Sequence, residues 1–117
     1  MEQIKQHLEE LNTMVLQGNA LDAFKKFYHE NVVMQENQNE PTVGKSQNWE
    51  RELEFFSNVT EFRDAALLEM AVNGNVSFTI WHYDYTHKDW GVRNYQQVAV
   101  QHWENGLIVK EQFFYGS

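Results

Sequence analysis

The stretch YHENVVMQEN, residues 28–37, has an apolar centre that ends in a carboxylate. Residues 32–36, VVMQE, have the composition of a short β-strand. Side chains alternate between the two faces of a strand, so Val32, Met34 and Glu36 share one face. Glu36 is therefore an acidic group at the end of an otherwise apolar strand face. This makes it the first candidate functional residue.

Length and composition limit the class of protein. The chain has 117 residues, the size of one domain, and 42% of them are hydrophobic, as in globular proteins. A formal charge of -8 without any Lys/Arg run argues against nucleic acid or membrane as a partner. The absence of cysteine excludes disulfides and thiolate sites. Residues 1–10, MEQIKQHLEE, lack the apolar core of a signal peptide, so we expect a cytoplasmic location.

Apolar periodicity predicts three helices before any long strand. Gly18 is expected to end the first helix, Asn19 to cap the second, and Ser46 to lie near the start of the third. Residues 37–44, NQNEPTVG, are predicted to form a loop. The expected apolar faces of the three helices are Ile4, Leu8, Leu11 and Val15; Leu21, Phe24 and Phe27 or Tyr28; and Trp49, Leu53 and Phe56.

From Thr60 onward the apolar period changes to two. This period predicts four long strands at about 61–72, 76–87, 92–103 and 107–115. Asn73-Gly74 and Asn105-Gly106 are typical of type I′ hairpin turns, because both residue types accept a positive φ. Helices followed by a meander of antiparallel strands predict an α+β fold.

The two faces of the sheet are assigned by keeping the aliphatic residues together, on the side that the helices would cover. The last hairpin is then expected to pair His102 with Val109 and Val100 with Glu111. The predicted inner face carries Val76, Phe78, Ile80, His82, Asp84, Val98, Val100, His102, Val109, Glu111, Phe113 and Tyr115. The predicted outer face carries Thr79, Trp81, Tyr83, Tyr85, Tyr95, Gln97, Gln101, Trp103, Lys110 and Phe114.

Each predicted face has a functional consequence. The inner face holds more ionisable groups than a plain core tolerates, which indicates a cavity that contains water or ligand. The outer face is rich in aromatic and amide side chains, which is typical of a protein interface. We therefore expect a small hydrophobic ligand inside and a homodimer contact through Trp81, Tyr83 and Trp103.

The order of these elements resembles the nuclear transport factor 2-like fold, and more closely its ketosteroid isomerase and SnoaL-like branch. The resemblance is carried by FYHENVVMQEN at 27–37, EPTVGK at 40–45 and VAVQHWENGLIVKEQFFY at 98–115. It implies a single SnoaL-like domain over residues 1–117. It further implies a cone-shaped antiparallel sheet wrapped around three N-terminal helices, with one pocket and usually a homodimeric assembly.

The resemblance also implies a role for Glu36. In steroid isomerases a carboxylate at the end of this first strand shuttles the substrate proton, and Glu36 holds the matching position. A shielded carboxylate there would have a raised pKa and could remove a proton next to a carbonyl. The alternative is a strand-end acid in water. The family's oxyanion donors fall on Leu11 and Val98, which cannot donate, so steroid isomerisation by that mechanism is not expected.

Other candidates complete the predicted site. Glu111 could orient His102 for proton transfer, or the two side chains could simply satisfy each other. His82 and Asp84 suggest a metal site, but about 20 Å along a strand separates His82 from His102, so the pair is placed at the pocket rim and no metal is expected. Further expected ligand contacts are Met34, Trp49, Phe56, Phe78, Val98, Phe113 and Tyr115.

Two functions fit this sequence. The first is a cofactor-independent isomerase, cyclase, lyase or hydrolase that acts on a small apolar carbonyl compound by acid–base chemistry. Glu36, His102 and Glu111 would be its catalytic residues. The second is a ligand-binding or dimerisation module with the same fold and no turnover. Fold alone does not decide between them.

Overall fold

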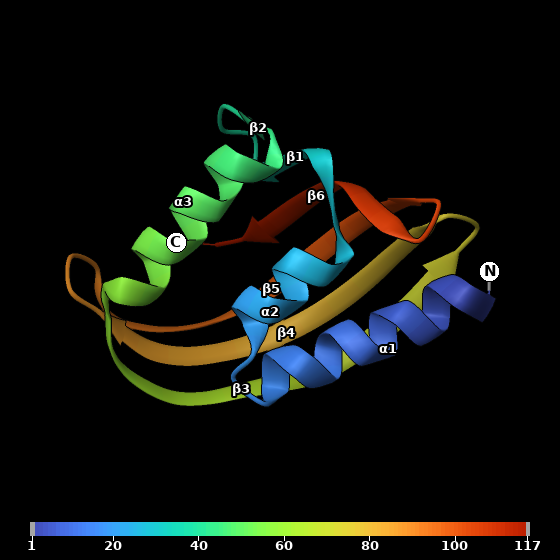
Figure 1. The fold of residues 1–117 in the computed structure, drawn as a ribbon. Coiled ribbons are helices and arrows are strands. Elements are labelled where there is room, and N and C mark those ends of the chain that lie inside the picture. Colours follow the sequence, from blue (N-terminus) through green and yellow to red (C-terminus); the bar gives the residue numbers. More distant parts are fainter. Residues whose placement is uncertain (1, 117) are drawn as a thin grey trace.

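The computed structural model describes residues 2–116 and has the predicted α+β architecture (Figure 1). Among these residues no helix is long and apolar enough to span a bilayer. One short strand, β2 (Thr42–Val43), lies in the segment 37–44 that the sequence predicts as a loop. The elements in chain order are α1 (Glu2–Leu16), α2 (Ala20–Phe27), β1 (Tyr28–Glu36), β2 (Thr42–Val43), α3 (Lys45–Ser57), β3 (Val59–Asn73), β4 (Val76–His87), β5 (Gly91–Glu104) and β6 (Leu107–Tyr115).

The six strands form one sheet in the order β2-β1-β6-β5-β4-β3. Strands β1 and β6 are parallel, and every other neighbouring pair is antiparallel. Figure 1 shows the long strands bending together, with the helices inside the bend. Irregular pairing at three places between β3 and β4 contributes to this bend, because bulges kink a strand and increase its twist. The sheet does not close, so a space remains between it and the helices.

A β-bulge in β6 decides which of its side chains face inward. Trp103 pairs with Ile108, but His102 pairs with Lys110, so Val109 is an extra residue. The predicted pairing of His102 with Val109 is therefore wrong. Beyond the bulge Glu111 pairs with Gln101 rather than with Val100, and the rest of β6 shifts with it.

The predicted faces of β4 and β5 are reversed in the structure. Trp81 and Trp103 are only 4% and 2% exposed, because they face the helices. Phe78, predicted to be inside, faces outward and is 37% exposed. The helices supply Leu8, Leu11 and Ala23 to the core and cover the aromatic and polar face of the sheet. The main buried residues of this core are Leu8, Leu11, Ala23, Phe24, Phe27, Val32, Met34, Trp103 and Ile108.

The two hairpin turns that were predicted at Asn-Gly sequences differ in how well they match the prediction. Asn105 and Gly106 have φ values of 52° and 83°, which fits the predicted type I′ turn. The other hairpin closes on Asn73 and Val76, so its loop is Gly74-Asn75, one residue later than predicted.

A buried asparagine sets the rotation of α3. The Nδ2 atom of Asn48 lies 2.8 Å from the Gly44 carbonyl oxygen and 3.0 Å from the Thr42 carbonyl oxygen. These contacts turn Asn48, Glu52 and Phe55 toward the sheet. Of the predicted inner face, Trp49 packs against the core and Phe56 lines the cavity, whereas Leu53 is exposed. The centre of the inward face is therefore shifted by one residue, about 100° around the helix axis.

Candidate functional site

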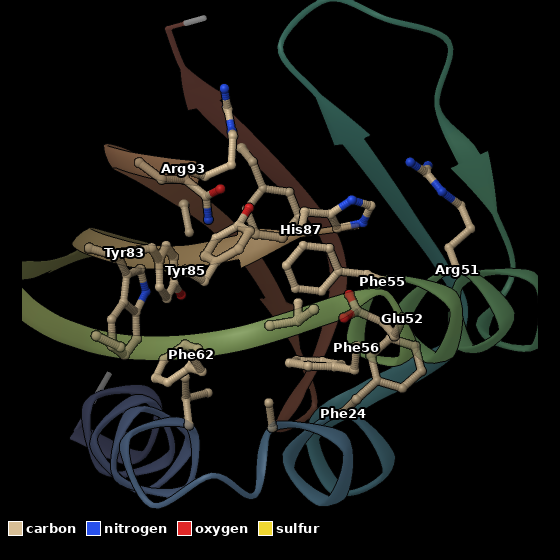
Figure 2. A pocket seen from close by; sticks show the side chains of 18 of the residues that line it. Phe24, Arg51, Glu52, Phe55, Phe56, Phe62, Tyr83, Tyr85, His87 and Arg93 are labelled. Carbon is tan, nitrogen blue, oxygen red and sulfur yellow. The ribbon is translucent and has the colours of Figure 1, made fainter. Parts of the chain in front are cut away.

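A cavity of about 970 Å³ lies between the helices and the concave face of the sheet. Its wall is largely aromatic, with rings from α2, α3, β4 and β5 (Figure 2). Acidic groups from β1, α3 and β6 open into the same space. A mostly apolar cavity with a few polar groups is typical of a small-molecule site. The aromatic residues in the wall include Phe24, Tyr28, Phe55, Trp81, Tyr83, Tyr85, Tyr95 and Phe113.

The most buried of these acids is Glu111, which is only 3% exposed. Its carboxyl group accepts hydrogen bonds from the Tyr28 hydroxyl and from Gln101 Nε2, the latter at 2.9 Å. Gln101 Oε1 accepts in turn from the Ser77 hydroxyl at 2.7 Å, and Ser77 Oγ accepts from Trp103 Nε1 at 2.9 Å. All of these partners are neutral. Burial raises the pKa of Glu111 to about 7, although the two hydrogen bonds favour its charged form.

A second carboxyl group, that of Glu52, points from α3 into the cavity beside Phe55 and Phe56 (Figure 2). It forms no hydrogen bond with any residue in the described range 2–116. Burial raises the pKa of Glu52 to about 7, the negative charges of Glu111 and Glu36 add to this effect, and Arg51 opposes it. Glu52 therefore faces the cavity with its full hydrogen-bonding capacity unused.

Glu52 and Glu111 together form what we call the carboxyl pair. Groups whose pKa values lie near 7 can both give and take protons at neutral pH. Two interacting carboxyl groups lose their protons in steps that belong to the pair rather than to one residue. At neutral pH one member can therefore act as a base while the other still holds a proton.

Two tyrosines supply neutral donors next to the carboxyl pair. Burial first, and then the charge of Glu111, raises the pKa of Tyr28 and of Tyr83 well above the ordinary range. Both hydroxyls therefore stay protonated. The Tyr28 hydroxyl is already used on Glu111, whereas that of Tyr83 has no hydrogen-bond partner within residues 2–116. Tyr83 is thus available to donate to a ligand.

A family model for the SnoaL-like domain matches residues 2–115. The chain belongs to the SnoaL-like family. A search of curated proteins finds no significant match.

Solved structures share the fold of this SnoaL-like chain. A Mesorhizobium loti protein, provisionally described as a SnoaL-like polyketide cyclase with "carbohydrate phosphatase" in brackets, has a TM-score of 0.87 at 21% identity, covering 96% of this chain and 98% of its own. A similarly described Jannaschia protein has a TM-score of 0.81 at 10% identity, with 97% and 85% covered. A Xanthomonas campestris protein with a cystatin-like fold has a TM-score of 0.84 at 11% identity, with 97% and 91% covered. Identities this low show the common fold only.

Glu36 lies at the end of β1 and lines the cavity of the SnoaL-like chain. It is held there by two partners. Arg51 forms an ion pair with it at 2.7 Å, and the Tyr115 hydroxyl donates a hydrogen bond to its other oxygen. Burial first, and then Glu36, raises the pKa of Tyr115 to about 12, so this donor stays protonated. The charge of Glu36 is therefore compensated within the protein, unlike that of Glu52.

The predicted pair of His102 and Glu111 is not formed. His102 lies on the opposite face of the sheet, because the faces of β5 are reversed relative to the prediction. Glu111 faces the cavity, because the bulge at Val109 shifts the later residues of β6. His82 is also outside, where its Nε2 atom lies 2.7 Å from Asn94 Oδ1. Asp84 accepts a hydrogen bond from Arg63 Nε at 2.9 Å, also outside the cavity. Within residues 2–116 no three histidine or acidic side chains form a set that could hold a metal.

The predicted ligand contacts divide into two groups. Four of them line the cavity: Met34, Phe56, Phe113 and Tyr115. Trp49 does not line the cavity. Its ring packs on the ring of Phe24, which does, with centroids 5.8 Å apart. Phe78 and Val98 face outward and do not line the cavity, which follows from the reversed faces of β4 and β5.

Four important residues were not predicted as site residues: Glu52, Tyr28, Gln101 and Tyr83. Glu52 was missed because the face of α3 was assigned one residue too far along. Gln101 and Tyr83 were placed on the outer face. Glu52 lies four residues after the buried Asn48, and residues i and i+4 share one face of a helix. That spacing was the signal in the sequence that could have placed Glu52 on the inward face.

Proposed function

We propose that this SnoaL-like chain binds a small, largely apolar molecule in its cavity and moves a proton on that molecule with the carboxyl pair. The observation that carries this proposal is the placement of Glu52 and Glu111 in one aromatic cavity. Glu52 is half-buried, and its carboxyl group opens into the cavity without a hydrogen-bond partner in residues 2–116. Such groups are typical of functional sites.

The proposed chemistry is proton transfer next to a carbonyl. Glu52, as the carboxylate, takes the proton from the carbon next to the carbonyl, and the C–H electron pair moves into the enolate. The Tyr83 hydroxyl is placed to donate a hydrogen bond to the developing oxyanion. Return of the proton to another carbon completes an isomerisation, and loss of a leaving group completes an elimination. Both outcomes balance without an oxidant or a reductant.

Binding without turnover is the second candidate function, and one observation favours it. The positions that would supply the family's oxyanion donors carry Leu11, which lines the cavity, and Val98, which faces outward. Neither has a side chain that can donate a hydrogen bond. If Tyr83 does not replace these donors, the cavity would hold its ligand unchanged.

Deuterium exchange distinguishes these two functions. We expect the wild-type chain to exchange the α-protons of small cyclic ketones with D₂O, as followed by proton NMR. The Glu52→Gln variant should be slower by roughly 100-fold, the lower end of the range for loss of a general base. Glu50→Gln, an exposed change on the same helix, is the matched control. Binding of a ketone without faster exchange, or equal rates for wild type and Glu52→Gln, would contradict the catalytic proposal.

Homodimerisation stays a prediction, but its predicted surface changes. Trp81, Tyr83 and Trp103 face the cavity or the core, so they cannot form an outer contact. A dimer through the sheet would instead use the outer face near Phe78 and Phe114, each 37% exposed. Light scattering over a range of concentrations tests this prediction, and the mass of one chain throughout would contradict it.

A further inference from the structure

We propose that the ligand carries a cationic nitrogen, as a protonated or quaternary amine on an apolar body. This inference rests on the proposed small-molecule function of the cavity and adds a chemical class to it. It follows from the charge balance of the cavity, from the two stacked aromatic pairs in its wall, and from the unpaired carboxyl group of Glu52.

The cavity is strongly acidic. Its acidic lining residues outnumber its basic ones by six to two. One of the two basic residues, Arg51, is used by Glu36. The other, Arg93, lies with its guanidinium carbon 4.8 Å from the centroid of the Tyr95 ring. Arg93 forms no ion pair within residues 2–116, and its Nε atom is buried without a hydrogen-bond partner. Neither arginine forms an ion pair with Glu52 or Glu111. The six acidic residues are Glu36, Glu52, Glu54, Glu61, Asp89 and Glu111. Glu54, Glu61 and Asp89 are exposed to solvent, and Glu61 forms an ion pair with Arg63 at 3.1 Å, so the acids without such compensation are Glu52 and Glu111.

The whole chain adds to this local field. Its formal charge is -8, so an anionic ligand would be repelled both on approach and inside the cavity. A cationic ligand would be attracted at both stages. The charge of the site thus selects against the phosphates and carboxylates that many other pockets bind.

Two stacked pairs of aromatic rings lie in the wall, and within each pair one face of each ring is covered by its partner. Trp81 and Tyr83 on β4 are stacked, with centroids 5.6 Å apart and planes at 14°. Phe24 and Tyr28, from α2 and the start of β1, form a second stacked pair at 4.7 Å. All four residues line the cavity. Ring faces attract organic cations, most strongly where water is excluded, and such aromatic cages bind quaternary ammonium groups.

A neutral ligand would leave the carboxyl pair uncompensated. It would displace water from Glu52, whose carboxylate has no hydrogen-bond partner in the protein, and this desolvation costs free energy. An ammonium group supplies both a charge and N–H donors, or in a quaternary amine the charge alone. Because it favours the ionised form of both acids, its binding near neutral pH should also release protons.

The inference is tested by isothermal titration calorimetry at pH 8, which measures the affinity for three probes. The probes share a naphthyl group and differ in charge. The probes are 2-(1-naphthyl)ethylamine, which is protonated at this pH, neutral 2-(1-naphthyl)ethanol and anionic 1-naphthylacetate. We expect the amine to bind at least about 10-fold more tightly than the alcohol, and the acetate to bind most weakly. In Glu52→Gln the affinity for the amine should fall to that for the alcohol, while the affinity for the alcohol should not fall. Glu50→Gln should match the wild type.

The possible contrary results separate the two proposals. Equal binding of amine and alcohol, or tightest binding of the acetate, would overturn the cationic class and leave the small-molecule cavity intact. An equal loss for all probes in Glu52→Gln would also overturn it, because the residue would then act only through the shape of the pocket. Absence of binding by all three probes would overturn both proposals.

Discussion

Replacement of Trp103 by alanine is expected to lower the free energy of unfolding by about 3–5 kcal/mol, the usual range for a fully buried aromatic residue. Trp103 is 2% exposed and packs edge-on against Phe27, with centroids 6.3 Å apart. The substitution leaves a large void and removes the indole N–H that donates to Ser77. Urea unfolding followed by circular dichroism measures the loss.

The matched control for this variant is Phe78→Ala on the outer face. Phe78 is 37% exposed, so its truncation should cost less than about 1.5 kcal/mol. The comparison tests which face of the sheet the helices cover. If Phe78→Ala were the more destabilising of the two variants, the inward placement of Trp103 would be wrong.

The second large effect is a gain in stability. At pH 8 we expect Glu52→Gln to raise the free energy of unfolding by about 2 kcal/mol, because the wild-type chain must keep a charged carboxylate in the cavity. Glutamine has nearly the same size and removes this charge. The gain should shrink to less than about 1 kcal/mol at pH 5, where the folded wild-type chain keeps Glu52 protonated.

The direction of this pH dependence follows from proton binding. The pKa of Glu52 is about 7 in the folded chain and 4.5 for the ordinary group. Between these values the folded chain binds the proton and the unfolded chain has lost it, so the stability from this group falls as the pH rises. Above about pH 7 the dependence ends. Urea titrations at pH 5 and 8, with Glu50→Gln as control, check it, and a gain independent of pH would contradict it.

The order of the elements and most strand boundaries could be predicted from the sequence, because the signals are local. The period of apolar residues changes near Thr60, and Asn105-Gly106 has the conformational freedom that a type I′ turn requires. The short strand β2 could not be predicted, since its two residues, Thr42 and Val43, gain their strand conformation only by pairing with β1.

The faces of the sheet could not be predicted from local signals. Along β4 both alternating sets are partly apolar, one with Phe78 and Ile80 and the other with Trp81 and Tyr85. Hydrophobicity therefore does not decide which set is covered. The packing of the helices decides it, since they cover the face that carries Trp81, Tyr85 and Trp103. The bulge at Val109 could not be predicted either, because no glycine or proline marks its position in the sequence.

The candidate site was partly predicted for a related reason. Glu36 and Glu111 were both selected, and both line the cavity. The partner of Glu111 was sought on the wrong face, at His102, whereas the acid that faces the same space is Glu52 on α3. Its position depends on the rotation of α3, which Asn48 sets through hydrogen bonds to backbone carbonyl groups of Thr42, Gly44 and, in β1, Val32. Contacts of that kind carry no periodic signal.

The most direct test of the account is a titration of Glu52 and Glu111 by carbon-13 NMR of their carboxyl groups. We expect both to titrate near pH 7 in the wild-type chain. In Glu111→Gln the midpoint of Glu52 should move down, because the charge of Glu111 contributes to its raised pKa. Midpoints near 4.5 for both residues would show that the two groups are open to water. The carboxyl pair would then not exist as a proton-exchanging unit.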